Sequence, residues 1–199
     1  MGQKFNMGAK AGAELIPGGR GLVHKFGRSE NQIIQISSIW TIEHWRQGVM
    51  INKLIESNIC PDEFINYMLD AGLAGGTAID PWYCFVYENN ATLAAGMTYA
   101  SHTAFTECTA YSGNRPLWDQ AGASAKVITS AASKASFTFS ATKTIYGCGI
   151  VGGGSTPTTK GDVAGGGTLG PVAAFAGGSV GVIDTDVLKV YMAVTGSDV

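Results

Sequence analysis

Apolar and polar residues alternate along two stretches in the second half of the chain, which predicts strands there. In Ala135–Val151, Phe137 and Phe139 alternate with serine and threonine, a period of two that is typical of a half-buried strand. A turn around Ala141–Lys143 is expected to lead into a second strand. Asp186–Val194 has the same period, and its larger apolar residues share one face: Leu188, Val190, Met192 and Val194. We predict that these two stretches are partners in a sheet.

A third alternating stretch lies nearer the N-terminus, at Asn31–Trp45. It predicts one long strand, or two that meet at Ser37–Ser38, with Trp40 on the more apolar face. His44 lies on the same face and has no second histidine nearby, so we expect a hydrogen-bonded core or interface residue. The apolar run Val49–Ile55 fits either a strand or a helix, and both remain open.

Two further segments have clear patterns. Pro61–Ala71 predicts a short helix, because proline suits the first helical position and two acidic residues follow it. Gly72 or Gly75 is expected to end this helix, and its apolar face comprises Phe64, Ile65, Met68 and Leu69. Asp80–Tyr87 predicts a buried strand that is apolar on both faces, as in the interior of a sandwich.

The chain divides into an arm and a domain. Residues 1–32 are glycine-rich and mildly basic, and we expect an extended N-terminal arm that becomes ordered on a neighbouring subunit. Residues 33–199 are expected to form one mainly β domain, an antiparallel β-sandwich or jelly-roll-like fold with one short helix. Within it, 33–78 supplies the lead-in strand and helix, and 79–199 supplies the core strands. The predicted core comprises Trp82, Phe85, Phe137, Phe139, Ile145, Leu188, Val190 and Met192.

Composition narrows the function. Hydrophobic residues make up 45% of the chain and charged residues only 14%, which indicates either small-residue-rich β structure or a surface covered by partners. The net charge of −2 and the lack of a basic stripe argue against nucleic acid as a partner. We expect no membrane span and no signal peptide. Four scattered cysteines without a C-x-x-C pair predict buried free thiols and no metal site, although a Cys84–Cys148 pair remains open.

No motif for catalysis or cofactor binding is convincing. Gly165–Gly170 matches G-x-G-x-x-G, but Pro171 follows where a dinucleotide site needs a helix, and Gly152–Gly161 lacks the order of a phosphate loop. We therefore expect no cofactor and no enzyme activity. Glycan hydrolysis would need paired carboxylates in a cleft, for which Glu88 and Glu107 are the candidates.

Several motifs between residues 82 and 138 nevertheless occur together in a known group of proteins. They are Trp82–Tyr83, Ala100–Glu107, Thr109–Tyr111, Arg115–Trp118 and Ser130–Thr138. With the glycine-rich C-terminal part, they cover a little over half of the chain. In these motifs the chain resembles a widespread group of tailed-bacteriophage structural proteins of unassigned role.

The resemblance implies a virion protein that assembles in the bacterial host cytoplasm. We expect a capsid decoration or cement protein, which binds the major capsid protein or other virion subunits and forms a homo-oligomer such as a trimer. The alternative is a head or tail fibre, spike or adaptor that exposes the loop from Asn89 to Trp118 to a receptor. The expected subunit or capsid contacts are Leu15, Ile16, Leu22, Val23, Trp40 and Trp45.

Overall fold

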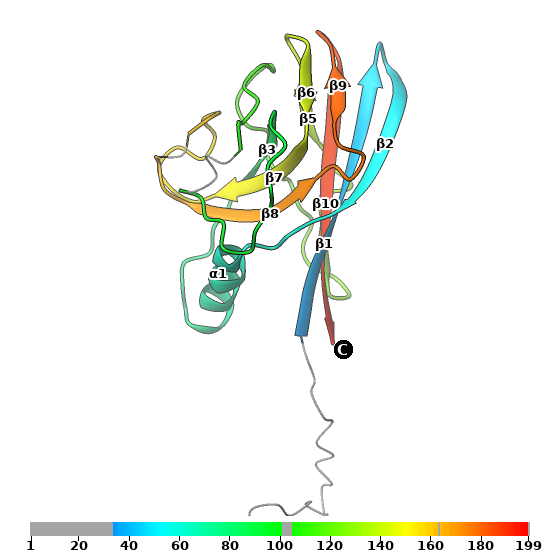
Figure 1. Ribbon diagram of the computed structural model, residues 1–199. Coiled ribbons are helices and arrows are strands. Elements are labelled where there is room, and N and C mark those ends of the chain that lie inside the picture. The colour runs from blue at the N-terminus through cyan, green and yellow to red at the C-terminus, as the bar shows by residue number, and fades with distance from the viewer. Residues whose placement is uncertain (1–33, 101–104, 163, 199) are drawn as a thin grey trace, which may run out of the picture.

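The computed structural model describes residues 34–100, 105–162 and 164–198 (Figure 1). The predicted arm at 1–32, with its anchors Leu15, Ile16, Leu22 and Val23, lies outside these residues. The described part is mainly β, with antiparallel sheets and one short helix, which confirms the predicted fold class. No helix in this part is long and apolar enough to span a membrane.

The larger sheet has five strands and contains the two longest strands of the domain. Its strands are β1 (Ile34–Arg46), β2 (Val49–Ser57), β4 (Val127–Thr129), β5 (Ala135–Thr138) and β10 (Val187–Asp198). They run in the order β2-β1-β10-β4, and β5 also pairs with β10. Two predictions are therefore confirmed: the N-terminal alternation forms one long strand, and the two C-terminal stretches are sheet partners. The run that fitted either a strand or a helix is a strand, β2.

A second sheet packs against the inner face of the first. It consists of β3 (Trp82–Tyr87), β7 (Gly147–Gly152) and β8 (Thr168–Ala174), and a separate pair is formed by β6 (Lys143–Ile145) and β9 (Val180–Val182). The strands expected in Ala135–Val151 are present, but β5, β6 and β7 each pair with strands from elsewhere in the chain. The turn at Ala141 thus carries the chain from one layer into another.

The core lies on both sides of the β3–β7 pair. All eight predicted core residues are buried, with side chains at most 4% exposed. Trp82, Cys84 and Val86 join the main cluster between the two sheets, where they pack with residues of β1, β5 and β10. Phe85 and Tyr87 point to the opposite side and form a second, aromatic cluster. The prediction that β3 is apolar on both faces is therefore confirmed.

Glycines in β7 make room for the aromatic rings of β3. Gly149 is the cross-strand partner of Phe85, and Gly147 is the partner of Tyr87. A Cβ at Gly149 would lie 2.7 Å from the Phe85 ring, and one at Gly147 would collide with the Ala173 carbonyl oxygen. The Tyr87 hydroxyl donates to that oxygen at 2.9 Å. Close packing of rings against a bare backbone explains part of the glycine content.

The predicted helix is present as α1 (Asp62–Leu73). Pro61 is the N-cap residue, one position earlier than expected, and Gly75 follows the helix with φ of +73°, a conformation that glycine adopts without strain. Phe64 is buried and packs edge-on against Trp82, with ring centroids 5.6 Å apart. Leu69 was expected on the buried face but is 51% exposed, since α1 contacts the sheet over a narrower stripe.

Candidate functional site

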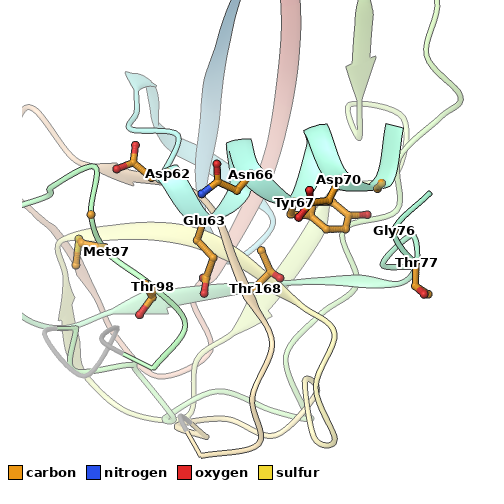
Figure 2. A pocket seen from close by; sticks show the side chains of 12 residues that line it. Asp62, Glu63, Asn66, Tyr67, Asp70, Gly76, Thr77, Met97, Thr98 and Thr168 are labelled. Carbon is orange, nitrogen blue, oxygen red and sulfur yellow. The ribbon is translucent and has the colours of Figure 1, made fainter. Parts of the chain in front are cut away.

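A cleft of about 650 Å³ lies between α1 and the loops that surround it (Figure 2). The helix contributes Asp62, Glu63, Asn66, Tyr67 and Asp70 to its lining, and the opposite wall includes Met97, Thr98 and Thr168. Among the residues that the structure describes, none with a basic side chain lines the cleft. Its chemistry therefore suits hydrogen-bond donors or cations.

Two of the polar residues in this cleft have structural roles. The Glu63 carboxylate accepts hydrogen bonds from the backbone amides of Tyr99 at 2.8 Å and Leu169 at 2.6 Å. The Tyr67 hydroxyl accepts one from the amide of Ile79 at 2.7 Å. Glu63 thus fixes α1 to a loop and to the start of β8, so much of the polarity of the cleft serves the fold.

The most buried charged pair lies elsewhere, in the loop that follows β3. Arg115 donates to Glu107 through Nε at 2.9 Å and Nη2 at 2.6 Å, and the two side chains are 0% and 2% exposed. Burial disfavours the charged form of Arg115, but its hydrogen bonds to Glu107 raise the pKa of Arg115. Arg115 also donates to the carbonyl oxygens of Pro157 and Asp162, each at 3.0 Å. This pair joins the loop after β3 to the glycine-rich loop before β8.

The loop from Asn89 to Trp118, expected to be exposed to a receptor, packs its main aromatic side chains against the domain, while many of its other described residues are exposed. The side chains of Tyr99, Phe105, Tyr111 and Trp118 are at most 5% exposed. The amides of Cys108 and Trp118 donate to carbonyl oxygens of β3, at 2.8 and 2.9 Å. The described residues of this loop therefore cover the outer edge of β3.

Glu88 and Glu107, the candidates for glycan hydrolysis, are both held in ion pairs. Glu107 binds Arg115, and Glu88 accepts from Lys143 at 2.9 Å. Neither carboxylate lines the α1 cleft. The backbone places the two residues on paired segments, since Tyr87 bridges Glu107 and the Glu88 amide donates to the Thr106 carbonyl oxygen at 2.7 Å, but each carboxylate is engaged by its own cation.

Asp186, the first residue of the predicted C-terminal strand, is a buried hydrogen-bond acceptor. Its carboxylate accepts from Arg46 at 2.7 and 2.9 Å, from His44 at 2.8 Å and from the Ile183 amide at 3.0 Å. The hydrogen bonds from Arg46 hold the pKa of Asp186 well below its usual range. The interpretation of His44 as a hydrogen-bonded core residue is confirmed, since it is 4% exposed. These contacts fasten the end of β1 to the start of β10.

The two tryptophans proposed as contact residues have different environments. Trp40 is fully buried within the core, so the prediction that it contacts a partner needs correction: it lies on the inner face of the sheet. Trp45 lies on the opposite face of β1, together with Glu43 and Lys189, and is partly exposed. Its Nε1 donates to Glu43 at 3.2 Å, and Lys189 Nζ lies 4.6 Å from its ring centroid.

An exposed apolar surface on β1 and β2 was missed by the sequence analysis. We call it the β2 patch, and its residues are Ile39, Val49, Met50, Ile51 and Ile55, which are 45–67% exposed. Nine large apolar side chains are exposed in the described residues, and these five share one hairpin. The available signal was the uncharged run before Lys53, which periodicity could not assign to a strand or a helix.

The cysteines and metal candidates give no further site. The described residues contain four free cysteines, so Cys84 and Cys148 do not pair, and the prediction of buried thiols holds for three of the four. No three His, Cys, Asp or Glu side chains in residues 34–100, 105–162 and 164–198 gather as a metal site. No family model, curated protein or solved structure matches this chain.

Proposed function

We propose that this protein is a structural protein of a bacteriophage virion, and that it acts as a capsid decoration or cement protein. The observation that carries the proposal is the β2 patch, in which four of the five exposed apolar side chains lie on β2, a strand at the edge of the sheet, and the fifth, Ile39, lies on its neighbour β1. An exposed, long, apolar edge strand promotes unwanted pairing unless a partner covers it. A subunit that functions between other subunits has such a partner.

The motifs that carry the phage resemblance support this proposal through the architecture that they build. Glu107 and Arg115 belong to those motifs and form the buried ion pair, and Tyr111 and Trp118 are buried beside it. The quoted residues therefore build the fold of the domain. A group that shares them shares an architecture, and its members can differ in where they sit on the particle.

The proposal requires no chemical step. A decoration protein stabilises the particle by burying surface against neighbouring subunits, at about 25 cal/mol for each Å² of apolar area before the cost of association. The major capsid protein is the expected partner, with further copies of this chain beside it. A position at the head or tail as a fibre, spike or adaptor is the alternative.

The test is a cryo-EM map of the intact particle, in which the density of this chain is located. Density repeated over the capsid lattice, with the β2 patch against a neighbouring subunit, is the expected result. Density confined to a vertex or to the tail would replace the decoration role with the fibre or adaptor role. A particle that lacks the chain altogether would reject the proposal.

A further inference from the structure

We propose that the free edge of β2 is completed by a strand from the N-terminal segment of a neighbouring copy, residues 22–26. This inference rests on the proposed function, because it needs copies of the chain to lie side by side. It assigns one occupant to the β2 patch. The argument starts from the edges of the sheets.

The other long edges in the described residues are covered by the chain itself. The loop after β3 lies along that strand, where the amides of Cys84 and Trp118 form backbone hydrogen bonds with the loop and the strand. Ile59 pairs with Val172 on the outer side of β8. By contrast, no backbone hydrogen bond between described residues joins the outer edge of β2, which lies at the margin of its sheet (Figure 1).

The geometry of β2 is suited to an added strand over part of its length. From Asn52 to Ser57 the register with β1 is regular, and the irregularity falls before this stretch, where Ile51 is an extra residue. Six regular residues match the usual length of a strand. Ile55 is 67% exposed within this stretch, so it would gain the most from a neighbour. Added strands of this kind bind through main-chain hydrogen bonds and alternate side chains.

The N-terminal segment has the matching chemistry. If Leu22–Phe26 is extended, apolar residues fall on both of its sides: Leu22 and Phe26 on one, and Val23 on the other. Charge favours the same contact: residues 1–32 carry five Lys and Arg against two Glu, whereas 33–199 carry eight against thirteen Asp and Glu. A basic segment is therefore attracted to the acidic domain.

The N-terminal segment is long enough to reach a neighbouring copy, and the direction in which it would run favours that copy over its own. Ile34 lies twelve positions after Leu22, and an extended chain of that length spans roughly 40 Å. Ile39 faces Ser57, so β1 begins near the end of β2. A segment that returns along the β2 edge to its own β1 by the shortest route would therefore run parallel to β2. Solvent-exposed parallel pairs are rare, whereas the segment of another copy is free to pair antiparallel.

Disulfide trapping between two full-length, differently tagged copies tests the inference. Both copies carry Cys60→Ser, which removes the one partly exposed native thiol. One copy also carries Ile55→Cys, and the other carries Leu22→Cys, Val23→Cys or His24→Cys, because the register is not fixed. The matched control places the first cysteine at Leu73, which is 84% exposed at the end of α1. Disulfide-linked dimers with both tags are expected with Ile55→Cys and not with Leu73→Cys.

The association of the copies is measured by sedimentation as a second readout. Ile55→Lys is expected to weaken self-association roughly tenfold, because it places a charge at a buried apolar contact. Leu73→Lys should leave association unchanged. An Ile55→Lys protein that associates as tightly as the wild type would overturn the inference, and so would a wild type that is monomeric at every concentration.

The remaining outcomes are equally decisive. The inference would be overturned if none of the three arm positions gave a dimer. It would also be overturned if a variant with both cysteines in one chain formed the disulfide within that chain and the two tagged copies formed none with each other. If the particle map places the protein on the capsid lattice but trapping fails, the decoration role stands and the strand addition falls. If trapping succeeds but the particle lacks the chain, the strand addition stands and the decoration role falls.

Discussion

Replacing Arg115 with methionine should destabilise the domain more than any other single loss of charge described above. The substitution removes the two hydrogen bonds to Glu107 and those to the Pro157 and Asp162 carbonyl oxygens. It leaves the Glu107 carboxylate 2% exposed, with the Gly161 amide as its remaining named donor. Breaking a buried ion pair from one side costs about 3–5 kcal/mol, mainly because a charge stays buried without its partner.

Urea denaturation followed by tryptophan fluorescence measures this loss as a change in the free energy of unfolding. Lys143→Met is the matched control, since Lys143 and Glu88 are 33% and 21% exposed and such a pair contributes under about 1 kcal/mol. Adding Glu107→Gln to Arg115→Met should restore part of the loss, because the uncompensated charge is removed. A loss for Arg115→Met no larger than that of the control would refute the reasoning.

Three further predictions follow from the core and the buried titratable groups. Gly149→Ala should cost about 1–3 kcal/mol of unfolding free energy, because its Cβ meets the Phe85 ring at 2.7 Å, whereas Gly181→Ala in β9 has open space and should be close to neutral. The pKa of Asp186 is lowered because Arg46 hydrogen-bonds its charged form, so Asp186 stabilises the fold above about pH 4 and this stabilisation is lost as the pH falls. When the free energy of unfolding is measured against pH, the difference between wild type and Asp186→Asn should therefore shrink below about pH 4. A thiol reagent at pH 8 should modify at most Cys60 in the native protein and all four cysteines in denaturant, because Cys60 is partly exposed whereas the other three thiols are buried, and burial also raises their pKa. Rapid native modification of more than one thiol would contradict the packing.

The strands that could be predicted from sequence are those with a long period of two. β1 and β10 alternate over most of their length, and β3 is a compact aromatic run between a proline and a polar turn. The three-residue strands β4, β6 and β9 are too short to establish any period. Their pairing depends on tertiary neighbours, which explains why the layer change at Ala141 was not visible in the sequence.

The polar sites were less predictable, because their partners are distant in the chain or lie in irregular loops. Asp186 and Arg46 are 140 residues apart, and no local pattern links them. Glu107 and Arg115 are only eight residues apart, but the loop between them has no regular structure that would fix their spacing. Exposure was also hidden, since an apolar run such as Val49–Ile51 has the same composition in a core strand and at an uncovered edge.

The division of labour within the domain indicates where its function lies. Glycines in β7 accommodate rings, the Glu107–Arg115 pair anchors the loops, and Asp186 fastens β1 to β10. Each of these unusual features is accounted for by the stability of the fold. The β2 patch is different, because its exposed side chains contribute little to the core and increase the risk of aggregation. A feature that makes the isolated domain prone to aggregate and does not stabilise it is best explained by an interaction, so the edge of β2 is the first place to look for the partner.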